Sequence, residues 1–139
     1  MKRVLLVAVL FLAACSDPYG ACVKAGADIA AGISGGFNTV VQLQQQGTIS
    51  APEALNVAGY LKFANDADKV FLTCTQAAHT TSKAGAFTSC AQAFATQLNN
   101  PQETALIHVG NASAQATVNT VINGITTGIS TLETALGGA

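Results

Sequence analysis

Apolar residues along this chain recur at steps of three and four, which places them on one face of an α-helix. No stretch alternates apolar and polar residues over a convincing length with the period of two expected of a half-buried β-strand. The C-terminal part shows the helical spacing most cleanly, in a stripe typical of a helical bundle or coiled coil. Its apolar residues are Val118, Ile122, Ile125, Ile129, Leu132 and Leu136. The pattern predicts an all-α protein.

Three segments carry the residues that usually begin a helix. In segment 50–53 a serine is followed by a proline and then by a glutamate three residues on, the order of a capping box. Segment 100–103 repeats this arrangement with an asparagine as the cap. Asp17 and Pro18 form the third start, since proline is favoured at the first helical position. Each of these segments therefore predicts a new helix.

Three further apolar stripes define the helix faces that we expect to be buried. The first helix, expected to end near Gly47, carries Cys22, Ile29, Ile33, Phe37 and Val40. The second, from about Ala51 to about His79, carries Val57, Leu61, Ala64, Ala67, Phe71, Cys74 and Ala78. After a turn at 80–85, the third helix carries Phe87, Cys90, Phe94 and Leu98.

The expected helix lengths decide how these pieces can stack. The first two helices are similar in length, as antiparallel neighbours should be, whereas the third is about half as long. A break at Gly110 and Asn111 would divide the remaining chain into a short helix over 101–109 and a full-length helix over 112–137. The sequence therefore predicts an antiparallel up-and-down helical bundle of about four main helices.

Two pairs of glycines, Gly32 with Gly36 and Gly124 with Gly128, lie at similar heights on the first and last helices. Glycine inside a helix costs about 1 kcal/mol relative to alanine, so something should offset this cost. The favoured interpretation is a close approach of the two helix backbones. The alternative is a shallow groove that accepts an apolar ligand or a partner helix.

Three cysteines, Cys22, Cys74 and Cys90, each lie on an apolar stripe, and the up-and-down geometry brings all three to one end of the bundle. A disulfide between Cys74 and Cys90 is favoured over Cys22–Cys74, because its turn is the shorter one. Three buried free thiols are the remaining alternative. No C-x-x-C motif occurs, and no histidine stands at ligand spacing from a cysteine, so we expect no metal site.

Charged residues are sparse, with four lysines and seven acidic residues in 15–139 and hence a net charge of −3 there. Such a chain offers no basic patch, so we expect no nucleic-acid partner. No nucleophile elbow, glycine-rich phosphate loop or haem-attachment motif is present, and no set of acid, base and nucleophile can be picked out. We therefore expect a protein that is not an enzyme and that needs no cofactor.

The N-terminal segment begins with two basic residues, Lys2 and Arg3, followed by an apolar run over 4–14 that is too short to span a bilayer. The run ends in Leu12, Ala13, Ala14 and Cys15. This order resembles the lipobox of bacterial lipoprotein signal peptides. The alternative is an ordinary secretory signal cut at the same place, which suits the sequence less well because Leu12 would stand where a small residue is preferred.

The resemblance implies a signal peptide over 1–14, removed before Cys15, and a lipid on Cys15 that holds a single domain over 15–139 to a membrane of the cell envelope. In a Gram-negative host the residue after the cysteine, which is not aspartate, favours the outer membrane. The sequence therefore predicts a membrane-tethered structural or protein-interaction module that could have an envelope protein as its partner. The alternative is a binding protein for a small apolar ligand, and an enzyme ranks below both.

Overall fold

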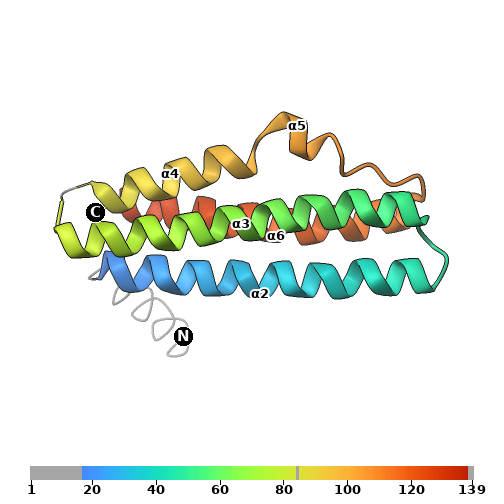
Figure 1. Ribbon diagram of the computed structural model, residues 1–139, viewed down its shortest axis with the longest axis horizontal. Coiled ribbons are helices and arrows are strands. Elements are labelled where there is room, and N and C mark those ends of the chain that lie inside the picture. Colours follow the sequence, from blue (N-terminus) through green and yellow to red (C-terminus); the bar gives the residue numbers. More distant parts are fainter. Residues whose placement is uncertain (1–16, 84, 138–139) are drawn as a thin grey trace, which may run out of the picture.

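The computed structural model of the chain describes residues 17–83 and 85–137, and within these ranges every regular element is a helix. Four main helices, three long and one about half as long, pack antiparallel to their neighbours, and a single short helical turn precedes the last of them (Figure 1). The elements are α2 (Pro18–Gln45), α3 (Ala51–Thr81), α4 (Ala86–Leu98), α5 (Pro101–Thr104) and α6 (Ala112–Gly137). The predicted all-α antiparallel bundle is confirmed.

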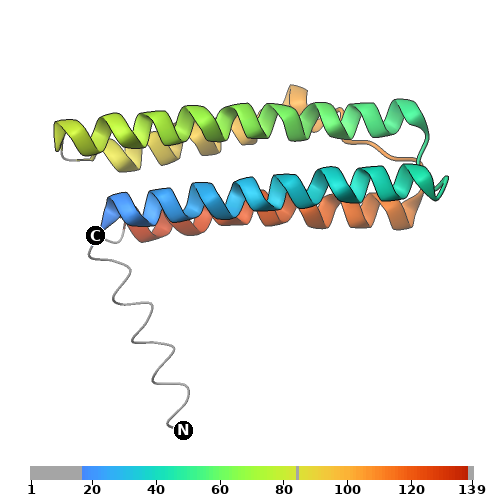
Figure 2. The same cartoon turned by 60° about the horizontal axis from the view of Figure 1, so that its bottom comes forward.

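The helices form two layers, with α2 beside α6 in one and α3 beside α4 in the other (Figure 2). Each of the four also packs against one helix of the other layer, α2 on α3 and α4 on α6. The start of α2, the end of α3, the start of α4 and the end of α6 lie at one end of the bundle (Figure 1). None of the described helices combines the length and the apolar character needed to cross a membrane.

The predicted helix starts are found at the expected residues. The Ser50 hydroxyl oxygen accepts a hydrogen bond from the Glu53 backbone N–H at 3.4 Å, and the Glu53 carboxylate accepts from the Ser50 N–H at 2.7 Å. This capping box satisfies backbone donors that a helix otherwise leaves unpaired. The Asn100 side chain caps α5 by accepting from the Gln102 N–H at 3.0 Å. Pro18 begins α2 as predicted.

The short helix expected over 101–109 ends at Thr104, so that prediction is too long. Beyond it the chain runs extended along the bundle, because α4 and α5 are short and an extended residue covers about twice the distance of a helical one (Figure 1). Gln115 holds this stretch by accepting from the Val109 N–H at 2.6 Å and donating to the Ile107 carbonyl at 3.1 Å. The break at Gly110 and Asn111 is confirmed.

Most of the predicted stripe residues are buried, but Phe37 is not. Its side chain is 36% exposed, and the neighbouring Gly36 takes the core position instead. A Cβ on Gly36 would lie 2.8 Å from the Val121 side chain and 3.0 Å from that of Leu61, so only glycine fits there without a shift. Cys74 is also exposed rather than buried.

Candidate functional site

All four predicted glycines, Gly32, Gly36, Gly124 and Gly128, line one surface groove of about 400 Å³ between α2 and α6. The floor of the groove is apolar and is formed by Ile29, Val121 and Ile125. Such a floor suits an apolar chain or side chain, provided that the rim leaves access.

The glycines of this groove differ in what surrounds them. At Gly36 the neighbouring side chains leave no room for a Cβ, and at Gly128 the nearest atom, from Ile29, would lie 3.4 Å away. At Gly35 and Gly124 nothing lies within 4 Å of where a Cβ would stand. The favoured interpretation of a close approach therefore holds at Gly36, but not at Gly124, and at Gly32 the nearest atom, from Ile125, would lie at an ordinary contact distance of 3.7 Å.

The rim of the groove is polar and nearly uncharged. Thr39 and Thr120 line its two sides, and the Thr39 hydroxyl donates to the Gly35 carbonyl at 2.9 Å. Asp28 is the one charged residue of the lining, and its carboxylate pairs with Lys24 one turn earlier on the exposed face of α2. The Asp28 carboxylate is thus the only ionisable group that lines the groove, and it is already paired with Lys24.

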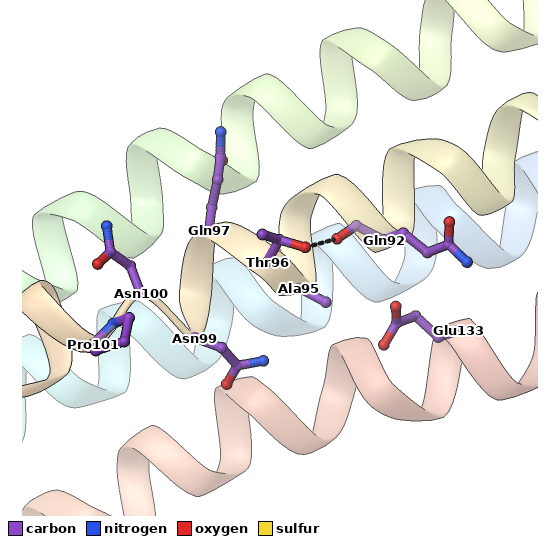
Figure 3. Close-up of a pocket in the computed structure, with 8 residues that line it drawn as sticks. All are labelled: Gln92, Ala95, Thr96, Gln97, Asn99, Asn100, Pro101 and Glu133. Atoms are coloured by element: carbon purple, nitrogen blue, oxygen red, sulfur yellow. Dashed lines mark hydrogen bonds between the residues drawn. The ribbon is translucent and has the colours of Figure 1, made fainter.

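A second hollow, of about 970 Å³, lies where α4 ends above α6. Figure 3 shows Glu133 pointing from α6 toward α4, with Gln92 and Asn99 on either side. The Thr96 hydroxyl donates to the Gln92 carbonyl at 2.8 Å. The hollow is bounded by the second half of α4, by the residues that lead to Pro101 and by Glu133 near the C-terminal end of α6.

This second hollow could not be predicted from the sequence, because its polar residues come from 92–101 and from Glu133, which share no motif. Glu133 is the single ionisable group of the lining, surrounded by carboxamides. A carboxylate among amides can bind hydroxyl or ammonium groups, but the hollow is open and offers no catalytic pair.

Three polar side chains, Asp68, Thr75 and Cys22, are buried between α2 and α3. Asp68 is 3% exposed, and its Oδ1 has no hydrogen-bond partner among the described residues. Burial raises the pKa of this carboxyl to about 6. Burial also raises the pKa of the Cys22 thiol, an effect that the adjacent Thr75 hydroxyl partly offsets. These groups lie inside the core and do not line either hollow.

Cys74 and Cys90 form a disulfide with a Cα–Cα distance of 5.8 Å, as predicted. Cys22 is free and buried next to Thr75, so the three cysteines do lie at the same end of the bundle. The alternatives of a Cys22–Cys74 pair and of three free thiols are wrong. Within the two described ranges no three histidine, cysteine, aspartate or glutamate side chains come close enough to hold a metal ion.

The start of α2 is held firmly against the end of α3. The Tyr19 hydroxyl donates to the Gln76 side chain at 2.7 Å, and the Tyr19 ring stacks on His79 with 3.9 Å between the ring centroids. The predicted lipidation residue Cys15 and the signal peptide 1–14 lie outside the described residues.

Comparisons of the chain with models of known protein families, with curated proteins and with solved structures found no match.

Proposed function

We propose that this chain is a membrane-tethered lipoprotein of the cell envelope that acts as a non-enzymatic structural or protein-interaction module. The observation that carries the proposal is the order of the N-terminal residues, which ends in Leu12, Ala13, Ala14 and Cys15. In this proposal the chain is cut before Cys15, and a lipid on Cys15 inserts into the membrane. A Gram-negative host would place it in the outer membrane.

The position of α2 supports a bundle that stays close to the membrane. Only Ser16 and Asp17 separate Cys15 from Pro18, the first residue of α2. Because Tyr19 fixes the start of α2 to α3, movement at the tether is passed to the whole bundle rather than absorbed by α2. The 31 residues of α3 span about 45 Å, which sets the reach of the module from its anchored end.

The distribution of polar groups supports a role in binding rather than in catalysis. The groove carries a carboxylate that already pairs with Lys24, the second hollow carries Glu133 alone, and Asp68 is enclosed in the core. By contrast, apolar side chains reach the surface of α2 at Val23 and Val41. Uncharged helix faces with exposed apolar side chains are what a helical partner packs against.

The tether is tested by separating membranes from soluble protein in the native host, comparing the wild-type chain with Cys15→Ser. We expect the wild-type chain in the membrane fraction, resistant to washing with high salt, because acyl chains and not charges hold it. Cys15→Ser should remain as an uncut precursor or appear in the soluble fraction. A Cys15→Ser chain that is processed and membrane-bound like the wild type would overturn the proposal.

The second candidate is a binding protein for a small apolar ligand, favoured by the apolar floor of the groove and by the open space at Gly124. A leucine at that position would project into the groove, since nothing lies within 4 Å of where its Cβ would stand. Gly59 is a matched control, because it is also an exposed helical glycine with nothing within 4 Å.

With a fluorescent fatty acid as the probe, a ligand-binding role predicts that Gly124→Leu loses at least about tenfold in affinity, or about 1.4 kcal/mol. Gly59→Leu should keep the wild-type affinity, and both variants should unfold at similar temperatures. If neither the wild type nor the control binds the probe, the ligand-binding function is wrong, and the structural or protein-interaction role is the one proposal that remains.

A further inference from the structure

Helix α2 carries two parallel stripes at the spacing of a coiled coil. The first is buried in the bundle and occupies positions 22, 26, 29, 33, 36 and 40. The second lies one residue further along at every step, and we call it the outer seam. It consists of Val23, Ala27, Ala30, Ser34, Phe37 and Val41. Steps of four and three repeat along its whole length, as at the two seam positions of a heptad.

Five of the six residues of the outer seam are exposed and Ala30 is half-buried, although the stripe is mostly apolar. Val23 is 41% exposed, Phe37 is 36% exposed and Val41 is 49% exposed. These are half of the large apolar side chains that the described residues expose, whereas the other three, Leu55, Val70 and Leu106, are scattered over other segments. A continuous apolar stripe at heptad spacing buries its surface only when a second helix packs along it.

The shape of the outer seam suits close packing of two helices. Its large side chains lie near the two ends, and its middle positions, Ala27, Ala30 and Ser34, are small. Small residues in the middle allow two helix backbones to approach closely, while the larger ones cover the ends of the contact.

The charges on α2 favour a second copy of the same chain as the occupant. No charged residue occurs between Asp28 and Glu53, and the only charged residues within α2, Lys24 and Asp28, pair with each other. A symmetric contact places identical residues opposite one another, so charges of one sign would repel across it. A foreign partner is usually selected by charges of the opposite sign, which the outer seam does not offer.

We propose that the outer seam pairs with the outer seam of a second copy of this chain, forming a parallel α2–α2 coiled coil at the membrane surface. The parallel direction rests on the proposed function, because two chains tethered through Cys15 both begin α2 at the membrane. The same tether sets the two helices in register.

The area of the contact explains why the tether is needed. From Val23 to Val41 the outer seam is about 27 Å long, and a strip about 12 Å wide buries on the order of 300 Å² on each chain. Stable dimers in solution bury about 1,200 Å² or more in total. The pairing is therefore weak in dilute solution and depends on the high effective concentration that confinement to one membrane supplies.

The test is cross-linking of the full chain in its native membranes, using Ala30→Cys. In a parallel coiled coil this position meets its own copy, so a mild oxidant should join two chains into a disulfide-linked dimer. Ala31→Cys is the matched control, since the residue is also alanine on α2 and is turned by about 100° from the outer seam. We expect several-fold more dimer from Ala30→Cys than from Ala31→Cys.

A second pair of variants shows whether the outer seam itself carries the contact. Phe37→Asp in the Ala30→Cys chain should abolish the cross-link, because it places like charges opposite one another in the seam. Val70→Asp, an equally drastic change of an exposed apolar residue on α3, should leave the cross-link unchanged.

Equal dimer yields from Ala30→Cys and Ala31→Cys in a membrane-bound chain would overturn the pairing while leaving the tether intact. A linked product with a different protein would do the same. A mixture of Val23→Cys chains and Val41→Cys chains that cross-links more strongly than Ala30→Cys would also overturn the pairing, because it indicates antiparallel helices. A chain found only in the soluble fraction would instead overturn the tether, and the parallel register with it.

Discussion

At the scale of single residues, the stability of this bundle depends on two carboxyl groups in opposite ways. Glu53 accepts hydrogen bonds from the backbone of Ser50 at 2.7 Å and of Gly110 at 2.6 Å, and these bonds lower its pKa to about 2. Glu53 thereby joins the start of α3 to the loop before α6. Asp68 is buried without a partner for its Oδ1, and burial raises its pKa to about 6. Ionised Glu53 stabilises the fold, whereas ionised Asp68 destabilises it.

Asp68 therefore gives the fold an unusual dependence on pH. The folded chain holds the Asp68 proton up to about pH 6, whereas the unfolded chain releases it near pH 4, so folding stability should fall as the pH rises between these values. The loss is on the order of 3 kcal/mol, from a pKa difference of about two units. Below about pH 4 folding stability should decrease as the pH falls further, because Glu53 becomes protonated and loses the hydrogen bonds that favour its ionised form.

Urea unfolding at pH 4.5 and pH 7 measures this effect, with Asp68→Asn as the comparison. The wild type should be more stable at pH 4.5, and Asp68→Asn should show little difference between the two values of pH. A wild type that is more stable at pH 7, or a variant with the same dependence, would contradict the account of Asp68.

At the scale of elements, local signals in the sequence predicted the helix boundaries well where caps set them. The capping residues Ser50 and Asn100 act only through neighbouring backbone groups, so their effect can be read from a short segment. The stretch after Thr104 could not be predicted in this way. Its extended path depends on distant partners, namely Glu53 on α3 and Gln115 on α6.

The core positions of α2 show a second limit of local patterns. Hydrophobicity favoured Phe37 for the core over Gly36, but the close approach of Val121 and Leu61 leaves room only for glycine. Which of two adjacent residues faces inward thus depended on the distance between helices, and that distance is a property of the packed bundle.

The adjacent glycines Gly35 and Gly36 should respond oppositely to alanine. Gly35→Ala meets no atom within 4 Å and should stabilise the fold by up to about 1 kcal/mol through helix propensity. Gly36→Ala forces Val121 and Leu61 to move and should be less stable than Gly35→Ala by about 2 kcal/mol. Thermal unfolding of both variants gives the comparison, and equal unfolding temperatures would show that the two helices do not approach as closely as described.

At the scale of the whole molecule, the sequence predicted the antiparallel arrangement, the Cys74–Cys90 disulfide and the grouping of four glycines between the terminal helices. These follow from helix lengths and from the heights of residues along them. The outer seam of α2 and the hollow above Glu133 were missed, since each depends on which faces the other helices leave uncovered.

If the chain is tethered through Cys15, the orientation of the bundle determines which of its surfaces other molecules can reach. The outer seam runs along α2 and the groove lies between α2 and α6, so both follow the long axes of these helices. The start of α2 and the end of α3 lie together at one end of the bundle (Figure 1). A bundle standing on a membrane would therefore present both surfaces sideways, toward other molecules on the same membrane.

The lipid tether is best tested by the intact mass of the protein extracted from its native membranes. We expect a chain that begins at Cys15 and carries an added mass of lipid size. After denaturation it should take up one thiol label without reductant and three with reductant, because Cys22 is free and Cys74 is bonded to Cys90. A chain that begins elsewhere, or one without added mass, would contradict the tether on which the proposed function rests.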